Sequence, residues 1–216
     1  MSCYTMTMKQ VKKIPVYWQA AKDYLSRNDA VLADLIQKIA PEKTLFSKQD
    51  PFFTFAKIIV GQQISVQAAD AIFGRFQALF SQKLSAKSFL ELDQKKILAL
   101  GFSKSKVRYL SNIARAIEEE KFLEHYQQLR TVKEKEKKLM EIVGIGQWSA
   151  DMFLIFHDLE ADICPLGDIG LINAIKKHYQ VKSNDEILKV CEQWHPYATV
   201  ATWFLWSDID DEIVAY

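Results

Sequence analysis

The residues that could do chemistry are concentrated in one stretch, residues 139–175. The triplet at 144–146, Gly-Ile-Gly, separates two helical patterns, and Asp168 stands directly before a third. Glycine tolerates the left-handed backbone angles that a tight reversal needs. The helix that follows starts with free N–H groups and a positive dipole end, which favour an anion such as a backbone phosphate. Taken alone, the triplet could be a plain helical hairpin and Asp168 a plain N-cap.

Three segments together resemble the helix-hairpin-helix DNA glycosylase superfamily and, more narrowly, the 3-methyladenine DNA glycosylase II family. The first is the hairpin GIGQWSA with the downstream PLGDIGL. The second is IIVGQQISVQAADAIFGRF, and the third is WHPYATVATWFLW near the C-terminal end. In the family's order, these marks cover most of residues 50–206. The resemblance implies an enzyme that flips a damaged nucleotide out of the duplex and breaks the bond between base and sugar.

Asp168 matches the family's catalytic aspartate. The sugar gains positive, oxocarbenium-like charge as the base leaves, and a fixed carboxylate nearby lowers that barrier and can assist an incoming water. The start of a helix suits this role, because its dipole and N–H groups favour a negative side chain. The N-cap and catalytic interpretations of Asp168 are therefore compatible.

The resemblance also implies two turns that contact DNA. One is the hairpin, and the other follows Gly61, where Gln63 matches a wedge that fills the gap left by the extruded nucleotide. The alternative for the second turn is a helix-linking turn with a capping amide. The predicted DNA-binding residues are Gln62, Gln63, Gly144, Ile145, Gly146, Gln147 and Ser149.

Trp148 occupies the position at which bifunctional relatives carry a lysine that forms a Schiff base. Its neighbours Gln147 and Ser149 cannot form one, so we expect a monofunctional enzyme without strand cleavage. By resemblance, Trp148 and Trp206 line the base pocket, where aromatic faces attract positively charged methylated purines. Core packing is the alternative for Trp206.

We expect no cofactor and no catalytic metal. The three cysteines, Cys3, Cys164 and Cys191, are widely separated and indicate neither a disulfide framework nor a zinc site. They are also too few for the iron–sulfur loop of some relatives. A structural Na⁺ or K⁺ ion is a further expectation from the resemblance, beside a DNA phosphate at the carbonyls of Val143, Gly144 and Gly146.

The chain has 216 residues, 49% of them hydrophobic, and a net charge of +1. The balanced charge means that any nucleic-acid surface must be local. Apolar residues at helical spacing predict an all-α fold of roughly ten helices. By resemblance, one glycosylase domain has two lobes around a cleft, about 1–50 plus 166–216 and about 51–165. It would lack the N-terminal mixed α/β lobe of larger relatives.

Local signals place individual helices. Asp29, Ser85, Asp93, Ser103 and Ser183 are predicted N-caps. The four-residue repeat of Ile64, Ala68, Ile72 and Phe76 predicts an amphipathic helix, and Pro196 is assigned to a first helical turn. Residues 1–14 suggest a short strand or an ordered tail.

The sequence therefore predicts a monofunctional glycosylase for alkylated purines in base-excision repair, with 3-methyladenine as main substrate and 7-methylguanine as a further one. The alternatives are a glycosylase for a deaminated or oxidised base and a non-catalytic hairpin module that only binds DNA. The expected partner is double-stranded DNA with alkylated bases. We expect a monomer in the cytoplasm, nucleoid-associated if bacterial, with no membrane span.

Overall fold

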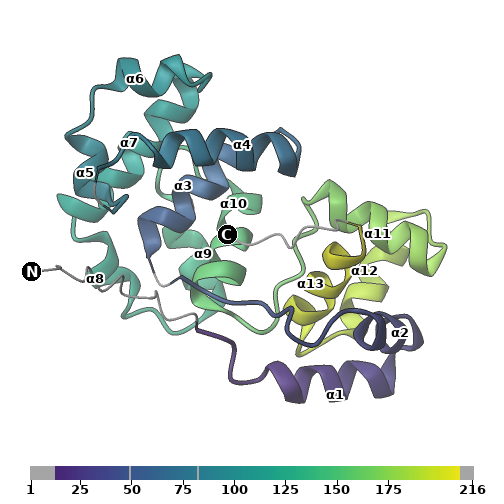
Figure 1. Cartoon of the computed structure of the whole chain (residues 1–216). Coiled ribbons are helices and arrows are strands. Elements are labelled where there is room, and N and C mark those ends of the chain that lie inside the picture. Colours follow the sequence, from purple (N-terminus) through teal and green to yellow (C-terminus); the bar gives the residue numbers. More distant parts are fainter. Residues whose placement is uncertain (1–12, 49, 82, 210–216) are drawn as a thin grey trace, which may run out of the picture.

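The computed structural model describes residues 13–48, 50–81 and 83–209, and within them the chain is helical (Figure 1). The helices are thirteen α-helices and one π-helix, and the sole β-type pairing in this part is an isolated bridge between Lys13 and Ser47. The predicted all-α class is confirmed. None of the helices described is long and apolar enough to cross a membrane. The strand or tail suggested for residues 1–14 falls almost wholly outside these ranges.

Five helices from the two ends of the chain pack together and carry Asp168, and we call this group the Asp168 lobe. Helix α13 lies against α1, α2 and α11, while α12 packs on α11. Trp18 meets the rings of Trp203 and Phe204 at centroid distances of 5.1 and 5.7 Å. The members are α1 (Trp18–Asn28), α2 (Ala30–Lys38), α11 (Ile169–Tyr179), α12 (Asn184–Gln193) and α13 (Ala198–Ile209).

The middle of the chain forms the second group, which we call the hairpin lobe. Helix α3 is its apolar centre, buried along most of its length and packed against α4, α7 and α10. The members are α3 (Pro51–Gly61), α4 (Val66–Gln77), α5 (Ala86–Leu90), α6 (Gln94–Ala99), α7 (Lys104–Glu118), α8 (Phe122–Tyr126), α9 (Val132–Met140), α10 (Gln147–Phe153) and the π-helix η1 (Leu154–Asp158). Figure 1 shows the two groups side by side, with α10 and α11 facing each other.

All five predicted N-caps are confirmed. Asp29, Ser85, Asp93, Ser103 and Ser183 each accept a hydrogen bond from a backbone N–H in the first turn of α2, α5, α6, α7 and α12. These side chains satisfy donors that a helix start would otherwise leave unpaired.

Two predicted helix starts are wrong. Ser65 caps α4 through the backbone N–H of Ala68, so Ile64 lies in the turn before the helix and is 38% exposed. Helix α13 starts at Ala198, because the N–H of Tyr197 closes a turn back to Trp194 at 2.7 Å, and Pro196 sits inside that turn. In both cases a local turn competes successfully with the helical pattern.

The expectation that no cysteines pair is also corrected. Cys164 and Cys191 form a disulfide with their Cα atoms 6.4 Å apart. They are separated by 27 residues, but α11 and α12 fold back on each other and bring the loop before Asp168 against α12. Spacing along the chain carries no signal of this pairing.

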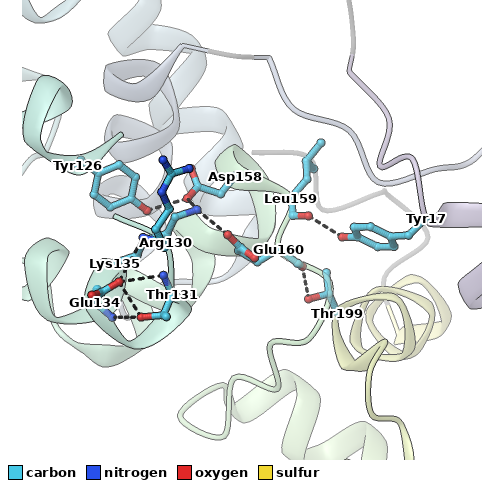
Figure 2. Close-up of polar contacts among 10 residues, drawn as sticks. All are labelled: Tyr17, Tyr126, Arg130, Thr131, Glu134, Lys135, Asp158, Leu159, Glu160 and Thr199. Atoms are coloured by element: carbon cyan, nitrogen blue, oxygen red, sulfur yellow. Dashed lines mark hydrogen bonds and ion pairs between the residues drawn. The ribbon is translucent and has the colours of Figure 1, made fainter. Parts of the chain in front are cut away.

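A short connector runs from Asp158, the last residue of η1, to Ile163; it joins the two lobes and is held from both sides (Figure 2). From the hairpin lobe, Tyr126 donates to Asp158 at 2.7 Å and Lys135 pairs with the same carboxylate at 3.0 Å. On the other side, Tyr17 donates to the carbonyl of Leu159 at 2.7 Å, and Thr199 of α13 donates to that of Glu160 at 2.7 Å. These bonds fix the point at which the chain crosses between lobes.

Asp29 joins the N-terminal helices to the C-terminal ones, and its replacement should show how much this joint contributes. Its Oδ1 caps α2, while its Oδ2 accepts from Tyr179 at 2.7 Å and Trp194 at 3.2 Å. We predict that Asp29→Ala lowers the free energy of unfolding in urea by about 3 kcal/mol, because it removes a cap and leaves two donors unpaired. The control Asp93→Ala removes a cap alone and should cost about 1 kcal/mol. Equal losses would show that the joint adds nothing.

Candidate active site

Asp168 is the N-cap of α11 and is partly buried. The N–H of Asp168 closes a turn onto the carbonyl of Pro165 at 2.9 Å, which sets the direction of the chain before the helix. Its Oδ1 then accepts the N–H of Leu171 at 2.8 Å. The structure therefore confirms the predicted cap, which uses Oδ1 and leaves Oδ2 available to another donor.

Two tryptophans complete the hydrogen bonding of this carboxylate. The indole N–H of Trp148, in the first turn of α10, donates to Oδ2 at 2.8 Å, and that of Trp206, on α13, donates to Oδ1 at 3.0 Å. Gly170 leaves room for this approach, since a Cβ there would lie 3.1 Å from Oδ1. An indole can only donate, so both rings are oriented by the carboxylate. Both tryptophans were predicted to line the pocket, but their bonds to Asp168 were not predicted.

A cleft of about 1430 Å³ opens between the two lobes and contains every predicted site residue apart from Val143. Asp168, Trp148 and Trp206 lie on its wall. Trp206 is 7% exposed and stacks on Phe156 at 5.9 Å, so it packs in the core while its edge lines the cleft. Contact with a flipped base stays a prediction. From the hairpin lobe, the cleft is lined by Gln62, Gln63, Gly144, Ile145, Gly146, Gln147 and Ser149.

The hairpin turns at Gly144, whose φ of 115° is in the left-handed region. A side chain there would also collide with the ring of Tyr109, at 2.4 Å from a Cβ, so this position needs glycine for two reasons. Ile145 is 5% exposed, which leaves mainly its backbone to face the cleft. Gly146 is the N-cap of α10.

Three of the predicted DNA-binding side chains, Gln62, Gln147 and Ser149, bond to the protein instead of pointing freely into the cleft, and Gln147 donates to Asp151 at 2.7 Å. The amide of Gln62 donates to the Ser149 hydroxyl at 2.9 Å and to the carbonyl of Gly144 at 3.3 Å, and Ser149 is 3% exposed. By contrast, Gln63 is exposed at the tip of its turn, with a φ of 60°. Contact with DNA stays a prediction for all of these residues.

The carbonyls predicted to hold a monovalent cation already accept hydrogen bonds. Asn112 donates to Val143 at 3.1 Å, Gln62 donates to Gly144 at 3.3 Å, and the N–H of Ala150 donates to Gly146 at 3.0 Å. A carbonyl oxygen has two lone pairs, so a cation would have to bind beside these hydrogen bonds. A monovalent ion at the hairpin stays a prediction.

Three residues of α7 reach the two turns, and these contacts were not predicted. Lys106 donates to the carbonyls of Val60 and Gln62, Tyr109 packs against Gly144, and Asn112 holds Val143. Their spacing of three residues was the available signal, since it places them on one side of a helix.

Known proteins resemble this chain along much of its length. The model of the HhH-GPD superfamily base excision DNA repair proteins matches residues 56–196. The chain is 26% identical to DNA-3-methyladenine glycosylase 1 of Schizosaccharomyces pombe in an alignment of 219 positions, which covers 94% of this chain and 92% of that protein. It is 31% identical to YfjP of Bacillus subtilis in an alignment of 166 positions, which covers 71% of this chain and 57% of YfjP.

Solved structures of glycosylases also match this fold. The 3-methyladenine DNA glycosylase of Schizosaccharomyces pombe in complex with abasic DNA matches with a TM-score of 0.76 and 27% identity, over 87% of this chain and 95% of that one. A DNA-3-methyladenine glycosidase from Bacillus halodurans matches with a TM-score of 0.67 and 29% identity, over 86% and 87% of the two chains.

Asp151 of α10 is a second carboxyl group close to the hairpin, and it is 5% exposed. Burial raises its pKa from 3.8 to about 7, and the charge of Glu136 adds to this, while a 2.7 Å hydrogen bond from Gln147 opposes it. Because the pKa is higher in the folded than in the unfolded chain, the folded state holds more protons between about pH 4 and pH 7. Stability should therefore fall as pH rises through this window.

We predict that Asp151→Asn, which cannot ionise, is more stable than the unmodified protein at pH 8 by about 2 to 4 kcal/mol, at ~1.4 kcal/mol per pKa unit. At pH 4 the two proteins should unfold alike, since Asp151 is then protonated in the folded state. Urea unfolding at both pH values measures the difference. A constant difference across this range would contradict the raised pKa.

Proposed function

The chain belongs to the HhH-GPD superfamily of base excision DNA repair proteins, and on that premise we propose that it is a monofunctional DNA glycosylase for alkylated purines. It would hydrolyse the N-glycosidic bond of 3-methyladenine and, as a second substrate, of 7-methylguanine. The observation that carries the proposal is the carboxylate of Asp168, held by three N–H donors on the wall of the cleft between the lobes. The glycosylase names of the relatives with near full-length matches support it.

The size of the cleft supports binding of an extruded nucleotide. A base stacked in a duplex is out of reach of any side chain, so the nucleotide must swing out before the bond to the sugar can break. Pockets for drug-sized ligands measure about 300–1,000 Å³. A cleft of about 1430 Å³ accepts a purine nucleotide together with part of its backbone.

The carboxylate then acts on the sugar. As the C1′–N bond breaks, its electron pair leaves with the base and positive charge spreads over C1′ and the ring oxygen. Asp168 faces this charge with a carboxylate whose position is fixed by Leu171, Trp148 and Trp206, so little reorganisation is needed when the charge forms. Water adds to C1′ and gives its proton to Asp168 or to solvent.

The indole rings supply the second part of the site. Their N–H edges are directed at Asp168, which leaves ring faces to contact the base. A base methylated at N3 or N7 carries positive charge, and an aromatic face attracts a desolvated cation by about 2 kcal/mol. Phe156 covers one side of Trp206, so Trp148 has the freer ring. Trp148 and Trp206 would thus bind the charged base and also hold the carboxylate of Asp168, which acts on the sugar of that nucleotide.

The arrangement of lysines supports hydrolysis by water over Schiff-base chemistry. Trp148 takes the place of the lysine that bifunctional relatives use. Two lysines line the cleft, but Lys57 pairs with Asp70 at 3.3 Å, and Lys106 donates to two backbone carbonyls at 2.7 and 2.9 Å. Neither amine is placed as a free nucleophile.

Double-stranded DNA is the proposed partner. The relative from Schizosaccharomyces pombe is bound to abasic DNA in its solved structure. In this chain, the turn at residues 62–65, which we call the Gln63 turn, lines the cleft that contains Asp168, and so does the hairpin. A duplex bound by the hairpin would therefore present its backbone to the carboxylate. Gln63 would then fill the space that the extruded nucleotide leaves in the duplex.

The direct test is release of free bases from methylated DNA. We predict that the unmodified protein releases 3-methyladenine, identified by chromatography, and that Asp168→Asn lowers the single-turnover rate by at least about 100-fold, since it removes the charge that faces the sugar. Asp168→Asn keeps an oxygen to cap α11, so its affinity for duplex DNA should change little. Asp93→Asn is the matched control at a remote cap and should release bases normally.

Three results would contradict the proposal. If neither form releases a base, the protein is a binding module. Release of uracil or 8-oxoguanine without release of methylated purines would reassign the substrate. A covalent protein–DNA adduct after borohydride treatment would show lysine chemistry and exclude a monofunctional enzyme.

A further inference from the structure

Gln62 of the Gln63 turn and Gly144 of the hairpin are 82 residues apart in the sequence, yet the two turns are bonded to each other. Gln62 is the link, since its amide donates to the Ser149 hydroxyl and to the Gly144 carbonyl at 2.9 and 3.3 Å. Ser149 is 3% exposed, so this contact is shielded from competing water. Movement of either turn would break these bonds, and the two turns are therefore expected to move together.

Lys106 of α7 holds the first turn from behind. Its ammonium donates to the carbonyl of Val60 at 2.7 Å and to that of Gln62 at 2.9 Å. The carbonyl of Gln62 belongs to the peptide that leads into Gln63, which has a φ of 60°. A left-handed residue other than glycine costs about 1 to 2 kcal/mol, so neighbouring contacts must hold it in place. Lys106 fixes the peptide plane on which this conformation depends.

The position of Lys106 suits this task. Val60 is one of the last residues of α3, where carbonyls lack partners within the helix and the dipole is negative. A lysine near a helix C-terminus satisfies such carbonyls. Burial lowers the pKa of Lys106, because the charge of its ammonium group is partly removed from water. The side chain is thus engaged with the protein and is not a solvated surface lysine.

Two further residues of α7 hold the second turn. The ring of Tyr109 fills the space beside Gly144, and Asn112 donates to the carbonyl of Val143 at 3.1 Å. Lys106, Tyr109 and Asn112 follow each other at intervals of three residues, so they lie on successive turns of one helix. One rigid element of fifteen residues therefore contacts both turns.

We propose that Lys106, Tyr109 and Asn112 form a brace on α7 that sets the separation between the Gln63 turn and the hairpin, so that Gln63 enters the duplex in register with the backbone that the hairpin grips. This inference rests on the proposed function. The three are positioning residues: Lys106 acts through the backbone of Gln62 and Gln63, and the other two act through Val143 and Gly144. Loosening the brace should impair insertion of Gln63 more than it impairs binding to DNA.

The test measures insertion directly and does not depend on catalysis. The probe is a duplex with 2-aminopurine beside a tetrahydrofuran abasic analogue, whose fluorescence rises when the stack is opened. Lys106→Met removes the donors and retains the aliphatic chain. We expect it to lower the fluorescence rise at saturating protein about fivefold to tenfold, the effect of losing one or two hydrogen bonds. Lys104→Met removes an equal charge from an exposed position on the same helix and should leave the rise unchanged.

A double-mutant cycle with Gln63→Ala separates positioning from general destabilisation. If Lys106 acts through Gln63, then Lys106→Met should cause no further loss of fluorescence in the Gln63→Ala protein. Lys106→Arg, which can still donate to two carbonyls, should restore much of the signal. Should Lys106→Met fail to fold by circular dichroism, Asn112→Ala removes the hairpin end of the brace at a half-exposed position and is expected to give the same coupling.

The outcomes are separable from those of the proposed function, because the abasic probe holds no base to release. Equal effects of Lys106→Met and Lys104→Met would overturn the brace, as would losses that simply add with Gln63→Ala. A wild-type protein that binds the probe without raising fluorescence would also overturn it, since no inserted residue would then need positioning. Failure to release methylated bases would overturn the proposed function alone.

Discussion

The carboxylate of Asp168 and its three N–H donors are the contact on which the site depends. Leu171 belongs to α11, Trp206 to α13 and Trp148 to α10, so the donors come from both lobes. Hydrogen bonds to a charged group are each worth about 1.5 to 3 kcal/mol. The carboxylate therefore has a fixed orientation and also joins the lobes across the cleft in which it lies.

The same geometry connects the proposed DNA-binding hairpin to the proposed catalytic carboxylate. Helix α10 begins at the hairpin and carries Trp148 in its first turn, so a displacement of the hairpin would move a donor of Asp168. The connector at 158–163 follows α10 and η1, and Tyr17 and Thr199 hold it to the Asp168 lobe. DNA bound at the hairpin would thus be positioned relative to the carboxylate of Asp168 through α10 and the connector.

Local signals predicted much of this structure, and long-range contacts account for the rest. The cap at Asp168, the glycine turn at 144–146 and the five other caps depend on neighbouring residues, which a sequence displays directly. The bonds of Asp168 to Trp148 and Trp206 span 20 and 38 residues, and no periodicity marks them. The disulfide and the contacts of Lys106 were not predicted for the same reason. They depend on the packing of α11 on α12 and of α7 on α3.

The most direct test of the central claim is the single-turnover rate of 3-methyladenine release by Trp148→Phe, Trp206→Phe and the double variant. Phenylalanine keeps an aromatic face but cannot donate to Asp168. If the indole donors hold the carboxylate in its working position, each variant should be slower by about tenfold or more, with affinity for abasic DNA unchanged. Wild-type rates in the double variant would show that Asp168 works without them and would contradict the account.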